Sequence, residues 1–288
     1  MVPGATDTVE IKLCGTYQVD LNVNIAVERL SVGCPTSGTQ TLRIAGFTMT
    51  VNNRADFGVR GALLLDAGTI AGAGLVDVSG AMTWSGGNLS GGGGSTRVLV
   101  GGTLSVTGSG SGRSLNNYTL ELAGTGTWGT TVAAMSSGSG GTLRVLAGGQ
   151  LDITGDFGVL YNQGGAASRM VVYGQLRRVT SLNPVQFTTT ADDSGTVAVL
   201  NGTLQLDGGG TSNGSYSVSA GNTLSFGGGT HSLAAASTVS GAGTVQIPGG
   251  TLTSVGGWSV TGAVTPSDPA GGVPAPTGEF YLVGKPGA

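Results

Sequence analysis

Short segments in which apolar and polar residues alternate follow one another along the whole chain. They are rich in Val, Leu, Ile and Thr and are bounded by Gly, Ser or Asn, as at Thr103–Val106, Leu151–Ile153 and Thr203–Leu206. Alternation with a period of two is typical of strands that bury one face, and the small or polar boundaries are typical of tight turns. The best helical segment, residues 233–238, is short and lies between strand-like segments. The pattern predicts an all-β protein.

Three segments repeat one phrase, which consists of a strand, a glycine-centred turn and a second strand. They are residues 94–108, 141–155 and 194–208. Self-similarity of this kind indicates stacked repeats. Equivalent leucines at positions 104, 151 and 204 are 47 and 53 residues apart, which fits two coils of roughly 22–26 residues per unit. We therefore expect the three phrases to stack one above another.

Equivalent positions in the three phrases predict which side chains share the core. Because residues i and i+2 point to one face of a strand, two apolar positions of each phrase should face inward together. The residue between them is Ser, Asp or Gln. The side chains expected in the shared core are Leu104 with Val106, Leu151 with Ile153, and Leu204 with Leu206.

A parallel β-solenoid accounts for this pattern better than a sandwich or an antiparallel barrel. Asn-Gly and Asp-Gly dipeptides, the usual hairpin turns, are few for so many strands. Thr, Ser and Asn rather than charged residues fill most outward positions, which suits the stacking of like residues on like. We expect about 12 coils and a rod of roughly 55–60 Å at the spacing of parallel strands.

The ends of the chain differ in composition from its middle. Residues 1–45 hold both cysteines and few glycines, and we expect them to form a disulfide-bearing cap on a single solenoid that spans residues 1–264. Residues 265–288 hold five of the nine prolines and are expected to form a Pro/Gly-rich C-terminal linker or tail. Within them, residues 279–283 predict a lone strand that returns to the rod.

Composition and charge exclude several classes of protein. Gly makes up 57 of 288 residues, only 9% of residues are charged, and the mean hydropathy is +0.21. No run approaches the ~18 apolar residues of a membrane-spanning helix, so we expect no membrane-spanning segment. The net charge is −3 and no basic stripe occurs, so nucleic acid is not an expected partner.

Cys14 and Cys34 are the only cysteines. We expect a disulfide between neighbouring coils, because a metal or redox pair would need a closer spacing or histidine partners, and the only histidine is His231. A disulfide indicates an oxidising, extracytoplasmic compartment. Residues 1–4 show neither the basic nor the apolar region of a signal peptide, so we expect a mature chain or a piece cut from a larger one.

Few side chains are placed for catalysis. Asp192 and Asp193 form the only adjacent acidic pair, and paired carboxylates can act as general acid and base, but the sequence around them favours an exposed turn. A lyase-like group of Asp152, Asp156 and Arg178 is a weaker alternative. Neither a phosphate-binding loop nor a calcium-coil repeat is present. We expect no enzymatic activity, no cofactor and no metal site.

The three tryptophans, Trp84, Trp128 and Trp258, allow two interpretations. As functional residues they would be glycan contacts that stack on sugars from a groove. As structural residues they would pack against the next coil, because each starts or ends a predicted strand. We favour the structural interpretation and keep the glycan contact as the alternative.

Several phrases resemble the repeats of large secreted bacterial surface proteins. They begin at Ala81 (Ala-Met-Thr-Trp-Ser-Gly-Gly-Asn-Leu-Ser-Gly), at Gly221 (Gly-Asn-Thr-Leu-Ser-Phe-Gly-Gly-Gly-Thr-His-Ser-Leu) and at Ser240 (Ser-Gly-Ala-Gly-Thr-Val-Gln-Ile-Pro-Gly-Gly-Thr-Leu). The resemblance is to filamentous-haemagglutinin-like and autotransporter-passenger-like β-helix regions, and it covers about residues 8–262. It implies a right-handed parallel β-helix displayed outside the cell as a stalk or adhesive fibre. It carries over no catalytic residues.

These observations predict a non-enzymatic structural or adhesive solenoid segment of an exported cell-surface or extracellular fibre protein. Its partners would be host or matrix glycans, or other copies of the same surface protein. The alternative is a carbohydrate-binding or polysaccharide-degrading β-helix. Carboxylates of neighbouring coils that converge in a groove would distinguish the second function from the first.

Overall fold

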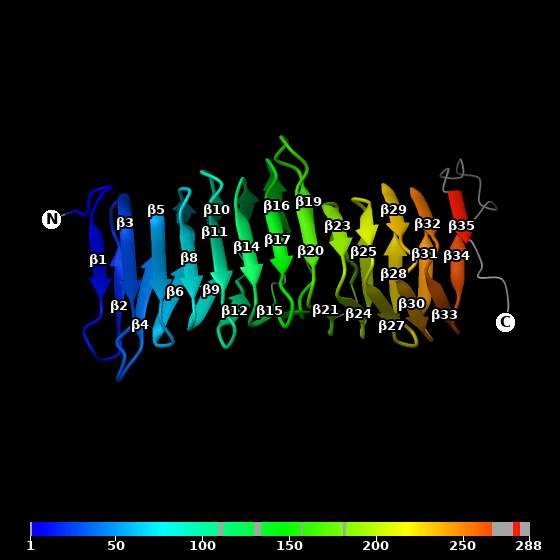
Figure 1. Cartoon of the computed structure of the whole chain (residues 1–288), viewed down its shortest axis with the longest axis horizontal. Coiled ribbons are helices and arrows are strands. Elements are labelled where there is room, and N and C mark those ends of the chain that lie inside the picture. Colours follow the sequence, from blue (N-terminus) through cyan, green and yellow to red (C-terminus); the bar gives the residue numbers. More distant parts are fainter. Residues whose placement is uncertain are drawn as a thin grey trace.

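The chain folds as a parallel β-solenoid. The computed structural model describes residues 2–108, 112–129, 134–156, 158–180, 183–266 and 279–282, and this part of the chain contains 35 strands and no helix. Neighbouring strands pair in parallel, and the coils follow one another from β1 at one end to β33, β34 and β35 at the other (Figure 1). The predicted all-β solenoid of about 12 coils is confirmed.

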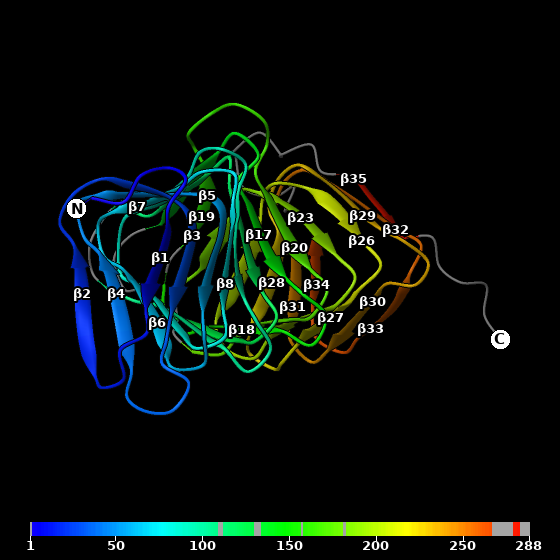
Figure 2. The ribbon, with the colours of Figure 1, turned by 60° about the vertical axis from the view of Figure 1, so that its left-hand side comes forward.

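Three faces of stacked strands enclose the interior, and Figure 2 shows the coils wrapping around it. Face 1 holds β7 (Thr69–Ala71), β10 (Asn88–Ser90), β13 (Ser114–Asn116), β16 (Met135–Gly138), β19 (Val159–Tyr161), β22 (Val185–Phe187), β25 (Thr203–Leu206), β28 (Thr223–Phe226), β31 (Thr244–Ile247) and β34 (Val264–Pro266). Face 2 holds β1 (Thr8–Ile11), β8 (Leu75–Val78), β11 (Ser95–Val98), β14 (Thr119–Leu122), β17 (Thr142–Val145), β20 (Arg169–Val172), β23 (Thr190–Asp193), β26 (Gly210–Ser212), β29 (Thr230–Leu233), β32 (Thr251–Ser254) and β35 (Glu279–Leu282). Face 3 is the 12-stranded sheet of β2 (Tyr17–Leu21), β4 (Gln40–Ile44), β6 (Gly61–Leu65), β9 (Ala81–Trp84), β12 (Thr103–Val106), β15 (Thr125–Trp128), β18 (Gln150–Ile153), β21 (Gln175–Arg178), β24 (Thr196–Val199), β27 (Ser215–Val218), β30 (Thr238–Gly241) and β33 (Gly257–Val260).

Faces 1 and 2 begin as one face and separate along the rod. In the first coils they are continuous through two long strands, β3 (Ile25–Val32) and β5 (Thr48–Phe57), which bend at a β-bulge. One residue of β3 lies opposite two of β5 there, and in the next coil residues 72–74 separate β7 from β8. Gly72 has a φ of +103°, and a Cβ at that position would lie 2.2 Å from the carbonyl oxygen of Val51. Only glycine fits so close an approach between coils.

One apolar core runs along the inside of the rod, and the predicted core positions are confirmed. Leu104 is 2% exposed, and Leu151, Leu204 and their partners two residues later are fully buried. The inward side chains of all three faces form one continuous cluster. Alternation along each strand therefore places the apolar residues inside, as the sequence pattern predicts.

The expected stacking of the three phrases is only partly correct. The strands of the first two phrases lie on the same faces two coils apart, with β14 between β11 and β17 on face 2, and β15 between β12 and β18 on face 3. The third phrase begins on face 3 as β24 and continues on face 1 as β25. It is displaced by one face because the second spacing runs over seven strands, from β18 to β25, where the first runs over six, from β12 to β18.

The two ends of the chain join the same ladders. Residues 2–45, where a cap was expected, form the first coils, and β1 and β2 pair with β3 and β4. The strand predicted near the C-terminus is confirmed, because β35 pairs in parallel with β32. Most of the predicted linker, residues 267–278 and 283–288, lies outside the described residues.

Candidate functional site

Two of the three tryptophans are core residues, so their interpretation as glycan contacts is wrong. Trp84 and Trp128 are 0% and 1% exposed, and their ring centroids lie 6.5 Å apart inside face 3. Trp258 is partly buried in the last strand of that face, where its indole nitrogen donates to the hydroxyl of Ser254. The alternation of β9 and β15 turns the large rings of Trp84 and Trp128 inward, where they fill the interior.

The acidic pair at Asp192 and Asp193 lies in strand β23 rather than in the exposed turn that the sequence favoured. Neighbouring residues of a strand point to opposite faces, so the two carboxylates cannot act together on one substrate. Asp193 faces inward and is 4% exposed, whereas Asp192 faces outward. The pair therefore does not have the geometry of a general acid and base.

The inward carboxyl of Asp193 has one strong partner. The hydroxyl of Tyr216 donates to its Oδ2 at 2.8 Å, while its Oδ1 has no hydrogen-bond partner among the described residues. Burial raises the pKa of Asp193 to about 7, because the effect of desolvation exceeds the lowering effect of the Tyr216 hydrogen bond. Burial also raises the pKa of Tyr216. This is a buried polar contact near the corner between faces 2 and 3.

The second acidic group suggested by the sequence is divided between two ion pairs. Asp152 pairs with Arg177 at 2.6 Å on the outer side of face 3. Asp156 pairs with Arg178 at 2.8 Å, and the Arg178 side chain is fully buried and also donates to the carbonyl oxygens of Gly155 and Asn183. The guanidinium of Arg178 therefore fastens a turn between coils. It is not a substrate-facing group.

The only histidine is enclosed in the core. His231 is 4% exposed, its Nε2 lies within hydrogen-bonding distance of the carbonyl oxygens of Leu206 and Gly228, and its ring contacts Phe226 edge-on. Burial lowers its pKa. Among the described residues, no group of three or more His, Cys, Asp or Glu side chains is placed to hold a metal ion.

The predicted disulfide is confirmed. Cys14 and Cys34 are bonded, with their Cα atoms 5.1 Å apart. Cys14 follows β1 and Cys34 follows β3, so the bond ties the first two turns between faces 2 and 3 to each other. The hydroxyl of Thr36 lies 3.2 Å and 3.3 Å from the two sulfur atoms.

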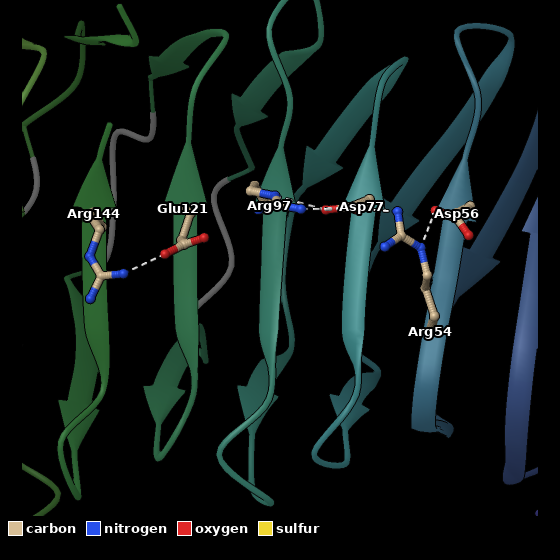
Figure 3. Close-up of polar contacts among 6 residues, drawn as sticks. All are labelled: Arg54, Asp56, Asp77, Arg97, Glu121 and Arg144. Carbon is tan, nitrogen blue, oxygen red and sulfur yellow. Dashed lines mark hydrogen bonds and ion pairs between the residues drawn. The ribbon is translucent and has the colours of Figure 1, made fainter. Parts of the chain in front are cut away.

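A row of charged side chains on the outer side of face 2 is the main polar feature of the rod. Strand pairing places one outward residue of each coil opposite the next. Figure 3 shows these residues on consecutive strands, with ion pairs that link Arg54 to Asp56 and Asp77, Asp77 to Arg97, and Glu121 to Arg144. The charge row consists of Arg54 and Asp56 on β5, Asp77 on β8, Arg97 on β11, Glu121 on β14 and Arg144 on β17.

Each ion pair of the charge row connects two coils or two residues of one strand. Asp77 is only 3% exposed. It forms an ion pair with Nη2 of Arg54 in the coil before it, at 2.6 Å, and another with Nε of Arg97 in the coil after it, at 2.9 Å. Glu121 receives Arg144 Nη1 at 2.5 Å. The Asp77 hydrogen bond raises the pKa of Arg97. Opposite charges attract along the stack from Asp77 to Arg144, and Arg54 pairs with both Asp56 and Asp77, which lie opposite each other.

The charge row is interrupted at Val171. Strand pairing places Val171 of β20 between Arg144 of β17 and Asp192 of β23, so a short apolar side chain stands where the row would hold a long charged one. A groove of about 260 Å³ lies there. Its lining residues are Thr142, Arg144, Arg169, Val171, Tyr173, Asp192, Asp193, Ser194, Thr211 and Asn213.

The acidic side chain on the outer side of the groove is already saturated. Asp192 Oδ2 accepts from Nε and Nη2 of Arg169, at 3.1 and 2.5 Å. Asp192 Oδ1 accepts from the backbone nitrogen and the hydroxyl of Thr211, at 3.1 and 2.8 Å. Partial burial favours a higher pKa for Asp192, but these hydrogen bonds exceed it and the pKa is lowered. The carboxylate remains ionised and satisfied within the protein.

Donor groups in the groove are satisfied less completely. Arg144 uses Nη1 for Glu121, and its Nε finds no hydrogen-bond partner in the part of the chain that the structure describes. Arg169 uses Nε and Nη2 for Asp192. Tyr173 is half exposed. Within the described part of the chain, no hydrogen bond engages its hydroxyl or the side-chain amide of Asn213, whose backbone nitrogen donates to the carbonyl oxygen of Asp193. The sequence alone did not reveal this groove, because it forms from residues of four successive coils.

Comparison with protein-family models, with curated proteins and with solved structures finds no match to this chain. Among the described residues, none forms a helix of the length and apolarity that crossing a membrane requires.

Proposed function

We propose that the chain is a non-enzymatic structural and adhesive solenoid segment of an exported cell-surface or extracellular fibre protein. The observation that carries the proposal is that charged side chains form ion pairs between neighbouring coils. Asp77 is held by Arg54 and Arg97 from the two neighbouring coils, and Asp152 by Arg177 from the next. Charged groups that serve a reaction are instead left available to a substrate.

The disulfide supports the exported location. Cys14 and Cys34 are the only cysteines, and their bond lies at one end of the rod. Structural disulfides persist in oxidising compartments and are rare in the cytosol. The bond joins the first coil, whose strands β1 and β2 have a neighbour on one side only within the described residues, to the second coil, which is paired on both sides.

The placement of the acid–base groups supports a role without catalysis. His231 is buried, Asp192 is saturated by Arg169 and Thr211, and Asp193 faces the core. General acid–base catalysis needs such groups within reach of a bound substrate. We expect incubation with pectin, alginate, chondroitin or xylan to yield no new reducing ends and no unsaturated products.

The test of the exported location uses intact cells of the source organism. An antibody raised against the purified chain should label unpermeabilised cells or the culture medium, and the protein isolated from either should contain no thiol that reacts before reduction. An antigen reached only after lysis, carrying two free thiols, would overturn the proposal.

The adhesive role has its own measurement. Beads coated with the chain should be retained under flow on polysaccharide-coated glass more strongly than beads coated with serum albumin. Equal retention of the two kinds of beads would reduce the proposal to a structural role.

A further inference from the structure

We propose that the groove at Val171 binds an acidic polysaccharide, one whose sugar units carry carboxylate or sulfate groups. The inference rests on the proposed function, because an exported adhesive rod is a protein that would meet such polymers. It goes further by naming the site and the class of ligand.

The shape of the groove indicates one or a few units of a chain-like ligand. Its volume of about 260 Å³ falls just below the ~300 Å³ at which pockets for whole small molecules begin. The groove is open along the outer side of face 2, where the strands β17, β20, β23 and β26 lie side by side. A polymer can place one unit in the groove and continue across the neighbouring coils.

The balance of donors and acceptors selects the charge of the ligand. Both oxygens of Asp192 are occupied by Arg169 and Thr211. Arg144 and Arg169 retain N–H groups beyond those that bind Glu121 and Asp192. The groove therefore offers guanidinium donors without a free outward carboxylate, and carboxylates and sulfates are the acceptors that a guanidinium binds best.

An aromatic ring completes the arrangement expected of a sugar site. Tyr173 is 50% exposed, follows directly on β20 and lines the groove together with Arg169 and Val171 of that strand. A ring with an apolar face and a polar hydroxyl packs against a sugar ring and bonds to its hydroxyls. Val171, which is 5% exposed, forms the apolar floor between these side chains.

General attraction of polyanions does not account for such binding. The chain has a net charge of −3, and the charge row on face 2 combines three arginines with three acidic residues. Electrostatics at long range therefore repels a polyanion, so an acidic ligand is held only where donors are concentrated.

The experiment measures binding of a galacturonic acid hexasaccharide to the purified full chain by isothermal titration calorimetry. The matched neutral probe is the fully methyl-esterified hexasaccharide. Three variants change the groove: Arg144→Gln removes a donor, Tyr173→Ala removes the ring, and Val171→Glu supplies an internal acceptor to the guanidinium groups. The matched control is Arg177→Gln, which removes an equivalent ion-paired arginine from face 3.

The acidic probe should bind at least tenfold more tightly than the neutral probe. Each groove variant should weaken its binding by at least tenfold, and Arg177→Gln should change it by less than twofold. Unfolding curves of the variants identify any that fail to fold, and Tyr173→Ala then provides the decisive comparison because no internal hydrogen bond of its hydroxyl is lost.

Three results would overturn the inference: no binding of the acidic probe, equal binding of the neutral probe, or equal weakening by Arg177→Gln. None of them bears on where the protein is located. Conversely, an antigen found only inside cells would contradict the proposed function and leave the affinity of the groove as measured.

Discussion

The coils before residue 208 and the coils after it stack in the same way but carry different outward side chains. Up to Asp207 the outer faces carry ion pairs between coils, such as Asp77 with Arg97 and Asp152 with Arg177. From residue 208 to residue 266 the chain contains no Asp, Glu, Lys or Arg at all. The outward positions there place hydroxyl-bearing residues opposite one another, as in Thr223 opposite Thr244 and Ser232 opposite Thr253.

The difference shows that the outer faces do not determine the fold. The core is equally closed in both regions, since Leu151 in a charged coil and Leu224 in an uncharged one are both fully buried. Surface ion pairs contribute about 0–1 kcal/mol each, whereas burying a leucine side chain contributes roughly 2–3 kcal/mol. The charged coils have ion pairs between coils and a groove. The uncharged coils have the same backbone hydrogen bonding but lack charged side chains to form such pairs.

The largest effect is expected from charging the core in each region. Leu151→Asp and Leu224→Asp should each lower the free energy of unfolding by about 4 kcal/mol or more, because each buries an unpaired carboxylate. Asp152→Ser, on the outer side of the same strand as Leu151, should cost less than about 1 kcal/mol. Denaturant unfolding measures all three. Tolerance of Leu224→Asp alone would mean that the uncharged coils are held by something other than their core.

The boundary between the two regions should make stability depend on pH. Asp193 has a folded-state pKa of about 7 against an ordinary value of 3.8. The folded state therefore binds more protons between these values, and stability falls as pH rises from about 4 to about 7 and is level above that. Asp193→Asn should remove this fall and be the more stable protein at pH 8, by about 2–4 kcal/mol.

The matched control for the pH dependence is Asp192→Asn. Hydrogen bonds from Arg169 and Thr211 lower the pKa of Asp192, so its contribution to stability is present above the ordinary pKa and is lost as pH falls. Its removal should therefore cost stability at neutral pH, the opposite sign to Asp193→Asn. Unfolding curves between pH 4 and pH 9 separate the two, and identical pH profiles for both variants would contradict the placement of Asp193.

An intermediate effect is expected where a carboxylate of the charge row is buried. Arg97→Gln leaves Asp77, which is 3% exposed, with Arg54 as its remaining cationic partner. The loss should be about 2 kcal/mol, below the cost of a completely orphaned buried charge. Arg177→Gln, whose partner Asp152 is more exposed, should cost under about 1 kcal/mol. Equal losses in thermal or denaturant unfolding would show that burial of Asp77 does not matter.

The smallest effect is expected from giving an uncharged coil an ion pair. Ser232 and Thr253 lie opposite each other on β29 and β32. The double variant Ser232→Asp with Thr253→Arg should change stability by no more than about 1 kcal/mol, and more favourably in low salt. Replacing both with Asp should be destabilising by a similar amount. A gain of several kcal/mol from the ion pair would contradict the view that the outward side chains do not determine the fold.

The sequence predicted the parallel solenoid, its core positions and its disulfide, because these depend on local alternation and on cysteine number. Leu151 and Ile153 point inward because of the alternation within their own strand, regardless of which coil lies next to it. The position of the third phrase could not be predicted, since it depends on the accumulated length of irregular turns. The structural interpretation of Trp84 and Trp128, which the sequence favoured over glycan contact, agrees with their burial, because both rings occupy inward positions of their strands.

The charge row has a signal in the sequence. Asp56, Asp77, Arg97, Glu121 and Arg144 recur at intervals close to one coil, with intervals of 20 to 24 residues between them in the chain. Once the coil length is known, such a series indicates one outward column. The groove could not be found in this way, because its defining feature is the absence of a charged residue at Val171.

The displaced third phrase has a consequence for how such a chain can grow. One strand–turn–strand segment serves as β11 with β12 across the corner from face 2 to face 3, and its repeat serves as β24 with β25 across the corner from face 3 to face 1. The same strand–turn–strand segment therefore forms either of two corners of the three-sided coil. A gene can lengthen the rod by duplicating a corner, without copying a whole number of turns, provided that the new strands keep their inward leucines.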